Sequence, residues 1–529
     1  MKILTKTKGQ STFLLVGVIF LVTVLMIATY FTVSQVNINS SGSNKAKGIA
    51  IQAADAGVNQ FISDITNRKV DIIGAALPLT RNYPVTLSGQ TITVPVSIDY
   101  LRAAGVPIKD LEGNNKYTLD AVATPIIAYG AKGAVPITRH VQANVSIVNL
   151  ARYNAFTIDH DMWAASGSTF DGPYHTNSYL EIGGTMYWNS ATLSGGGANP
   201  FYSDTYVTMA AEDIRQLSGW SAPTFYTMNA KRGRLSSSGV YDICTSTGSP
   251  SGTWFDKTHG GMLVNIRPIP YATYYNYSQV ILQLSNLPWF RLNGADVTCT
   301  AASNLTIDVG VTGLSARIKI NLNAFGTGSA DDVFQGSANY INALTSTYGA
   351  IIYCTDDVAV YGRLPATIGV SNTNKKVMIV SQKSIEIIGD ILYSGDSYAA
   401  GLETYDPAVP FPVPATSNPT NDALALICTD NIYVNPWRKA TSTFFMNSDD
   451  MKISGMLYGY SGCLTGGGRS YKSGGSSSIS QFTTFGGQTF NTGGVVPGSF
   501  NVGYDPNLHT NISKLVPVGV GVISWMEIQ

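Results

Sequence analysis

Three pairs of adjacent aspartates are the residues whose types and spacing come closest to an acid–base site. The pairs are Asp331-Asp332, Asp356-Asp357 and Asp449-Asp450. Two carboxyl groups close together can carry out glycoside hydrolysis, and they can also hold Ca²⁺. Aspartates are also frequent in turns, where their side chains bond to the backbone. We interpret Asp356 and Asp357 as turn residues and keep a polysaccharide lyase or glycoside hydrolase as the alternative.

His175 and the five cysteines are the other side chains with reactive or metal-binding groups. His175 stands two residues before Asn177, where it could bind a sugar or a metal or form a hydrogen bond that caps a turn; we expect the hydrogen bond. No CxxC or Cys/His spacing exists among the cysteines, which argues against zinc; they are Cys244, Cys299, Cys354, Cys428 and Cys463. A disulfide between Cys244 and Cys299 stays open. GxSxG, HExxH and phosphate-loop motifs are absent from the sequence, so we predict no catalytic residue, cofactor or metal.

A run of tyrosines is the strongest sign of a binding surface. Residues 270–277 have the sequence PYATYYNY. Aromatic rings stack on sugar rings, and neighbouring Asn and Thr side chains supply hydrogen bonds. We therefore predict a ligand contact, with polysaccharide as the candidate ligand, at Tyr271, Tyr274, Tyr275 and Tyr277. The alternative is that these rings pack inside the protein.

The composition excludes some partners. The formal net charge is 0 and 12% of the residues are charged, so the chain has no basic surface for nucleic acid. With 53 Gly and 29 Tyr, its polar surface must be built mainly from Ser, Thr, Asn, Gly and Tyr. This mixture is typical of an extracellular, mainly β protein.

Three segments in the second half of the chain align without gaps and predict how the body is built. They begin at Ile351, Met378 and Ala425. Each consists of a short apolar strand, a small residue, three polar turn residues and a second alternating strand. Strand pairs repeated in this way are typical of a parallel β-helix, whose turns stack and bury a common interior.

The same alignment gives two cysteines and one aspartate pair a structural role. Cys354, Ser381 and Cys428 share one position, which predicts an inward column of small residues. Asp356 and Asp357 fall in the turn that follows this position. We therefore expect buried, unreactive cysteines and turn-forming aspartates.

An uncharged apolar run from Phe13 to Phe31 determines where the chain resides. Its length meets the roughly 20 residues needed to cross a hydrocarbon core. Lys2, Lys6 and Lys8 precede it, so the positive-inside bias places the N-terminus in the cytoplasm and the rest of the chain outside. A cleaved secretory signal, an uncut anchor and a pilin-like segment are the three interpretations, and the run is long for a signal core.

This region resembles the N-terminus of type IV pilin-like proteins, in particular the PilX-type minor pilins and pseudopilins. The resemblance is carried by Lys8-Gly9 before the run and by the segment QAADAGVN at 52–59. It implies cleavage by a prepilin peptidase after Gly9, which leaves Gln10 as the first residue, and it implies other pilin subunits as partners. Major pilins carry a glutamate where this chain has Leu14, and such a carboxylate pairs with a neighbouring amine. The resemblance therefore implies a minor or non-polymerising member.

A second resemblance concerns the body. The segments DGPYHTNS at 171–178, GYDP at 503–506 and ISWME at 523–527 resemble a bacterial domain family of unassigned function found in pilus-associated surface proteins. This resemblance implies surface display beside a pilus system and brings no catalytic residues. Tapirins, cellulose-binding β-helix proteins associated with pilus gene clusters, are similar in expected architecture only.

These observations predict a mainly β protein. The expected parts are a leader at 1–9, a transmembrane and amphipathic helix at 10–68 with a polar break at 37–44, a small antiparallel β module at 69–150, and a right-handed parallel β-helix at 151–529. The β-helix is expected to contain an insertion at about 198–295 and a Gly/Ser-rich segment at 459–500 that forms either a long loop or thin late turns. The predicted function is a membrane-anchored or pilus-associated surface protein that acts without catalysis in adhesion or pilus assembly. A polysaccharide-degrading enzyme and a structural envelope protein are the alternatives.

Overall fold

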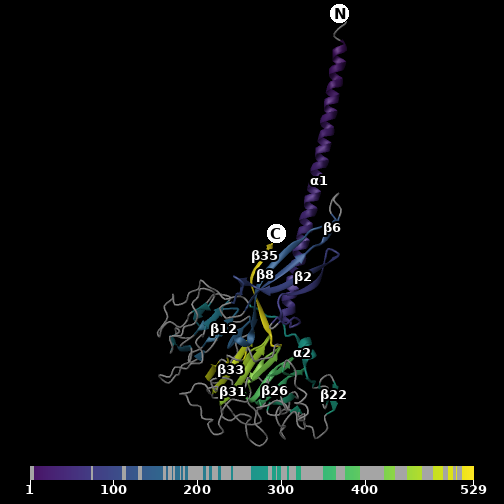
Figure 1. Ribbon diagram of the computed structural model, residues 1–529. Coiled ribbons are helices and arrows are strands. Elements are labelled where there is room, and N and C mark those ends of the chain that lie inside the picture. Colours follow the sequence, from purple (N-terminus) through teal and green to yellow (C-terminus); the bar gives the residue numbers. More distant parts are fainter. Residues whose placement is uncertain are drawn as a thin grey trace.

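The computed structural model places a long helix above a head and a body of strands (Figure 1). It describes residues 5–158 apart from 73–74, 110–114 and 129–133, and beyond them the strands, turns and short helix named below, between residues 162 and 528. In the head, the lower half of the helix lies against an antiparallel sheet. The body lies on the side of the head opposite the free half of the helix.

Helix α1 runs without interruption from Thr5 to Thr66. The expected break at 37–44 is not present, because each residue added to an existing helix gains a backbone hydrogen bond and polar residues can continue it. The hydroxyls of Thr23, Thr29 and Thr32 each donate to the carbonyl four residues earlier, at 2.8, 2.8 and 2.9 Å. The apolar half of α1 thus satisfies these polar groups internally.

The head sheet has the strand order β1-β2-β5-β8-β35-β19. Its first four strands are Leu79–Leu87, Gln90–Tyr100, Lys116–Ala123 and Arg139–Asn149. Three of these strands closely match segments in which polar and apolar residues alternate, at 91–98, 117–124 and 140–148. Their alternation puts Val94, Leu119 and Ala143 on the face that packs against Phe61 and other residues of α1.

The last two strands of this sheet come from distant parts of the chain. β35 (Val518–Ile528) pairs antiparallel with β8, and β19 (Val264–Asn265) pairs with β35. Both segments were expected within the β-helix at 151–529, and this boundary is corrected: 518–528 pairs with β8 and belongs to the head. The chain therefore leaves the head at β8 and returns as the neighbouring strand, which makes the body an insertion between two adjacent strands.

The body, here called the stack, contains two ladders of parallel strands, β20-β25-β27-β29-β31-β33 and β24-β26-β28-β30-β32. Ile351 lies opposite Met378, and Met378 lies opposite Ala425. In the second ladder Val358 lies opposite Ile385. Both registers are those of the gap-free alignment, which is confirmed. The first ladder consists of Val280–Leu282, Ala350–Cys354, Lys376–Ser381, Ala423–Cys428, Asp450–Gly459 and Gln481–Phe490. The second consists of Arg317–Asn321, Val358–Arg363, Ile385–Leu392, Ile432–Val434 and Leu464–Gly466.

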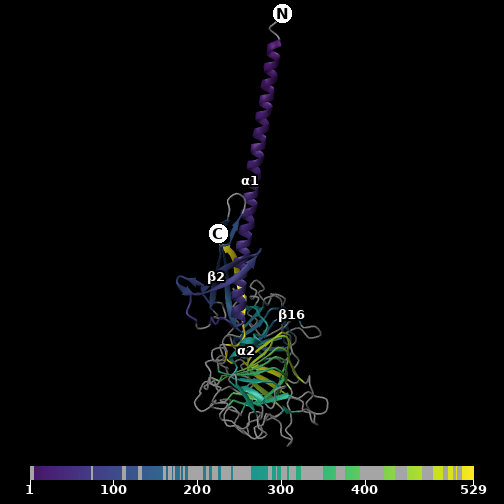
Figure 2. The same cartoon turned by 90° about the vertical axis from the view of Figure 1, so that its right-hand side faces the viewer.

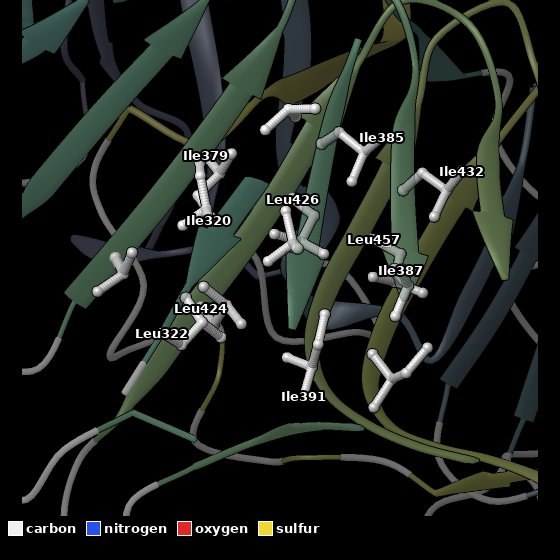
Figure 3. Packing of buried hydrophobic residues seen from close by; sticks show 14 of the residues in the cluster. Ile320, Leu322, Ile379, Ile385, Ile387, Ile391, Leu424, Leu426, Ile432 and Leu457 are labelled. Carbon is white, nitrogen blue, oxygen red and sulfur yellow. The ribbon is translucent and has the colours of Figure 1, made fainter. Parts of the chain in front are cut away.

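An apolar interior fills the space between the two ladders (Figure 3). Ile379 and Leu426 of the first ladder and Ile385 and Ile432 of the second belong to it. Alternate residues of the first ladder, such as Met378, are buried on its other face under the head. Burial on both faces explains why these strands have nearly continuous apolar sequences.

The predicted column of small residues is also present. Cys354, Ser381 and Cys428 lie in register and are fully buried. Gly459 continues the column in β31. The two cysteines are thus small core residues, as expected.

The order of strands along the stack differs from their order in the chain. β33 pairs in parallel with β9 (Ala155–Thr157), β9 with β12 (Pro173–Thr176), and β12 with β15 (Tyr206–Met209). The labels β12, β33, β31 and β26 accordingly follow one another across Figure 1, and Figure 2 shows the molecule from the side, roughly along the stack. The chain therefore enters the stack in its middle, runs to one end, resumes at the other end with β20, and returns to the middle. We call the β33–β9 junction the seam.

The predicted insertion and the Gly/Ser-rich segment both contribute strands to the stack. The region 198–295 contains β15, and the Gly/Ser-rich region 459–500 contains β33, which supports late turns rather than a long loop there. The remaining strands are β3 Arg102–Ala103, β4 Val106–Pro107, β6 Ile126–Ala128, β7 Ala134–Pro136, β10 Met162–Ala164, β11 Thr169–Phe170, β13 Leu180–Ile182, β14 Thr185–Trp188, β16 Ile214–Gln216, β17 Thr224–Thr227, β18 Val240–Tyr241, β21 Trp289–Leu292, β22 Ala295–Thr298, β23 Ile307–Asp308 and β34 Ser499–Gly503. The described elements also include a 3-10 turn at Leu150–Arg152 and the short helix α2 at Tyr271–Tyr277.

Candidate functional site: the membrane helix and the joint

The upper half of α1 projects from the head with its apolar side chains exposed (Figure 1). From Leu15 the helix is long and apolar enough to cross a membrane. Its most apolar 18-residue segment has a mean hydropathy of 2.4, and no part of that segment is buried. Gly9 and Gln10 lie within the backbone of α1. Their side chains are outside the described part, so cleavage between them stays a prediction.

The lower half of α1 fits closely against the head sheet because its contact face carries small residues. A Cβ added at Gly57 would come within 2.7 Å of Val94 Cγ1, so only glycine allows this approach. Asp55 accepts a hydrogen bond of 2.6 Å from the indole Nε1 of Trp525. The segment 52–59 therefore holds the last strand as well as the first ones. Sequence reasoning missed the Asp55–Trp525 contact, because nothing local links the two residues.

Two of the predicted ligand-contacting tyrosines are engaged in hydrogen bonds inside the protein. Tyr274 has no exposed surface and donates its hydroxyl to the Leu515 carbonyl at 2.8 Å. Tyr271 is half-buried, donates to the Ser381 carbonyl at 3.0 Å, and contacts the Thr429 hydroxyl. Burial raises the pKa of both phenols, so they remain neutral donors. The prediction of a ligand contact is therefore wrong for Tyr274, whose ring is part of the core.

The other two tyrosines of α2 differ in exposure. Tyr275 packs edge-on against Tyr353, with ring centroids 5.5 Å apart. Tyr277 is the exposed tyrosine among the four, with 42% of its surface accessible to solvent. The structure thus favours the alternative interpretation for most of the run, in which the aromatic rings pack within the protein.

Together these contacts form what we call the joint between head and stack. Its residues come from the end of β8 and the turn after it, from α2 and the residues just before it, and from Leu508, Leu515 and Val516. They pack on the outer face of the first ladder: Val148, Leu150, Tyr153, Ile269, Tyr274, Leu508, Leu515 and Val516 against Ile351, Met378, Ile427 and Tyr458. In addition, the Thr273 hydroxyl donates to the Asn67 carbonyl at 3.2 Å, just after α1 ends. Helix α2 therefore touches the residue that follows α1, the segment that returns to the head, and the stack.

His175 also has a structural role. Its Nε2 lies 3.0 Å from Asn177 Oδ1, and its ring stacks on Phe156 with centroids 4.7 Å apart. Asn177 Nδ2 donates to the Val264 carbonyl at 2.9 Å while its Oδ1 accepts from the Val264 N–H at 3.1 Å. Since Oδ1 is the acceptor, His175 Nε2 carries the proton. Burial lowers the pKa of the imidazole to about 4, so the ring is neutral at pH 7. The expected hydrogen bond is confirmed.

The aspartates of the described turns bond to neighbouring turns. Asp357 Oδ1 accepts the Ser384 N–H at 3.1 Å, and Asp356 forms an ion pair with Lys383. The turn-forming role of this pair is confirmed. Asp331, Asp332, Asp449, Cys244 and Cys299 lie outside the described residues. Among the residues that are described, no group of three or more His, Cys, Asp or Glu side chains could hold a metal.

No known protein family matches this chain, and no curated protein and no solved structure matches it either.

Proposed function

We propose that this chain is a membrane-anchored, pilus-associated surface protein that acts without catalysis in adhesion or pilus assembly. The observation that carries the proposal is the division of α1. Its upper half is apolar and bare, and its lower half is the support of an antiparallel sheet. A bare apolar helix of this length requires lipid or other helices as its cover.

The shape of the rest supports display at a surface. We propose that the two ladders close into a right-handed parallel β-helix, since their strands pair in parallel around one apolar interior. The joint holds this body below the head, on the side away from the free half of α1 (Figure 1). The surface of the body that points away from the head would then face a polysaccharide or another cell. That surface, rather than α2, would make the contact.

The rival proposal, a polysaccharide-degrading enzyme on the same scaffold, has less support. Asp356 and Asp357, its best candidates, are already bonded to Lys383 and to the Ser384 backbone. A third proposal, a structural envelope protein, shares the anchor but requires no contact with another surface.

Mass spectrometry of the N-terminus, on protein from the cells that produce it, tests the proposal. We expect a chain that begins at Gln10 in the membrane or surface fraction. Gly9→Val should block this cleavage, whereas Gly17→Ala, at a helix position with open space around it, should not. An intact Met1 in both parent and variants would contradict the pilus association and leave a simple anchored protein.

A further inference from the structure

The β6–β7 hairpin extends the head sheet toward the free half of α1. β6 continues the direction of β5, and β7 leads into β8. The hairpin also continues the pairing of those strands: Ile126 lies opposite Pro136, and the Ile137 N–H donates to the Pro125 carbonyl at 3.1 Å. Figure 1 shows β6 and the C-terminus at the end of the head from which the free half of α1 emerges. We call this end of the head the membrane-side end.

The hairpin presents apolar side chains to solvent. Ile126 is 57% exposed, and Pro136 opposite it is exposed as well. Residues 125–137 contain one charged residue, Lys132. At the opposite end of the sheet, where β2 ends beside the start of β5, the β3–β4 hairpin lies in segment 101–115, which contains four charged residues. The two ends of the sheet therefore differ, and the membrane-side end has the composition of a contact surface for an interfacial partner.

Helix α1 determines which partner that end can meet. The apolar span and the support of the head belong to one uninterrupted helix, so the head is held in a fixed orientation relative to the span. The close approach of Gly57 to Val94 and the bond between Asp55 and Trp525 hold the head against this helix. The membrane-side end therefore faces the bilayer that the span crosses.

The lengths of helix and strand bring the hairpin to the lipid headgroups. The β35 residue that bonds to Asp55 is in register, through β8, with Leu119 of β5. From Leu119 to the end of β6 at Ala128, an extended chain covers up to about 30 Å. Phe31 lies about 36 Å from the level of Asp55 along α1, and the headgroup layer adds about 5–8 Å outside the hydrocarbon core. At full extension the end of β6 therefore reaches the headgroup layer.

Two lysines give the same end a positive charge. Lys45 and Lys47 are the first charged residues of α1 after the apolar run, and Lys45 is exposed. Lys45 lies about 21 Å beyond Phe31, and its side chain leans toward the N-terminus of the helix, which here is toward the membrane. Its ammonium group is then roughly one Debye length, about 8–10 Å, from the headgroups. Arg139, near the hairpin, is already paired with Glu527 at 3.3 Å.

We propose that the membrane-side end of the head binds the surface of the bilayer that α1 crosses. The β6–β7 hairpin enters the headgroup layer with Ile126 and Pro136, and Lys45 and Lys47 face anionic lipid headgroups. The inference rests on the proposed membrane anchor and adds a second attachment beside the span. Residues 32–44 carry no charge, so the helix between span and head does not oppose this approach. The attachment would keep the body pointing away from the membrane.

Fluorescence quenching in proteoliposomes tests the contact. The full chain is placed in vesicles that contain phosphatidylglycerol and a lipid with a nitroxide on its headgroup, and an environment-sensitive fluorophore is attached at Ile126→Cys. This label should be quenched several-fold more strongly than the same label at Val106→Cys, an exposed apolar position in the opposite hairpin. The parent chain treated with the same dye gives the background from its own cysteines. Pro136→Cys provides a second labelled position if Ile126→Cys does not fold.

The role of charge is tested by replacing both Lys45→Gln and Lys47→Gln, and separately by vesicles of phosphatidylcholine in place of phosphatidylglycerol. Each change should reduce the quenching at position 126 by about half or more and leave that at position 106 unchanged. Full quenching after both changes would overturn the part of the inference that concerns anionic lipid.

Equal quenching at positions 126 and 106 would overturn the whole inference. So would an emission shift at position 126 that grows with the ratio of protein to lipid, because a second copy would then cover the hairpin. Chains that do not float with the vesicles would contradict the proposed membrane anchor, and the inference would fall with it. An intact Met1 in cells would instead contradict the pilus association alone, since this contact requires only the anchored chain.

Discussion

Two junctions of the stack use the same parallel backbone pairing but differ in what else holds them. At the β27–β29 junction, six residue pairs run from Lys376↔Ala423 to Ser381↔Cys428. At the seam, three pairs run from Gln488↔Ala155 to Phe490↔Thr157. Consecutive strands of a ladder are kept together by the chain that connects them, whereas the seam joins segments far apart in the sequence. The seam must therefore be held by its contacts alone.

The side chains at the two junctions differ accordingly. The β27–β29 junction packs aliphatic residues such as Ile379 and Leu426 into the interior. At the seam, Phe156 lies in register between Thr489 and His175. Its ring packs edge-on against that of Tyr153, with the ring centroids 5.3 Å apart. The seam also brings together the two ends of the chain segment that forms the stack. This segment can therefore begin after β8 and end at the neighbouring strand β35. A parallel β-helix whose strands followed chain order would have its ends far apart.

The largest effect is expected from Phe156→Ala at the seam. Loss of a buried aromatic side chain costs about 3–5 kcal/mol of unfolding free energy. Because the seam joins segments far apart in the chain, we expect the β9–β12 side to open in a separate, earlier step. Hydrogen exchange monitored by mass spectrometry in urea should show early exchange of Ile158 and Asn177, whose N–H groups bond across or beside the seam.

The matched substitution in the continuous part of the stack is Leu426→Ala. We expect a comparable loss, about 2–5 kcal/mol, but in a single transition. If both variants unfold in one step, or if Leu426→Ala also separates the two sides, then the seam is no weaker than other junctions and the comparison fails.

A pH-dependent loss of stability is expected at His175, beside the seam. Its pKa is about 4 in the folded protein and 6.5 in the unfolded chain. Between these values the unfolded chain binds more protons, so stability is complete above about pH 6.5 and falls as the pH decreases toward 4. The loss amounts to roughly 3 kcal/mol at its limit. Thermal unfolding at pH 7.5 and pH 5 measures it.

His175→Gln, which keeps a neutral donor for Asn177, should remove most of this acid sensitivity. Equal acid sensitivity of the His175 variant and the parent would show that the imidazole does not titrate with unfolding.

A smaller effect is expected at a turn between consecutive strand pairs. Asn431 Oδ1 accepts the Cys463 N–H at 2.9 Å, much as Asp357 accepts that of Ser384. Asn431→Ala leaves this N–H without its acceptor and should cost about 1–3 kcal/mol. Asn431→Asp keeps an acceptor and should lose less. Denaturant unfolding compares the two variants, and equal losses would mean that the side-chain oxygen contributes nothing.

The junctions of consecutive strands were predictable from the sequence, and the seam was not. The alignment of 351, 378 and 425 gave the correct register because each strand pair repeats its apolar and turn positions locally. The pairings of β9 with β33 and of β35 with β8 leave no such repeat. One local signal was present: Gly486-Gly487 inside a strand marks a close approach, and a Cβ at Gly487 would lie 2.7 Å from the Tyr153 carbonyl.

The candidate binding residues show a different limit. An aromatic run is equally suited to a sugar surface and to a buried joint, because ring stacking and core packing select the same side chains. Only the contacts of Tyr274 with Leu515 and of Tyr275 with Tyr353 distinguish the two. The apolar span of α1 was found because lipid-length runs are local. The contact of Asp55 with Trp525 was not found, because the two residues are far apart in the sequence.

The smallest effect is expected for Cys428→Ser in the column of small residues. Cys428 Sγ lies 3.4 Å from the Asp430 carbonyl, and Ser381, at the same position one strand away, already donates to the Asp356 carbonyl at 2.8 Å. A serine hydroxyl at 428 would therefore find an acceptor, and the cost should stay below about 1 kcal/mol. Burial raises the pKa of the Cys428 thiol, so the protonated thiol contributes little beyond its size. Thermal unfolding of Cys428→Ser beside the reciprocal Ser381→Cys tests this, and a loss of 3 kcal/mol or more, about the cost of a core cavity, would mean that sulfur packing rather than small size selects this column. In that case aliphatic and sulfur contacts would hold consecutive strands as specifically as the aromatic contacts hold the seam.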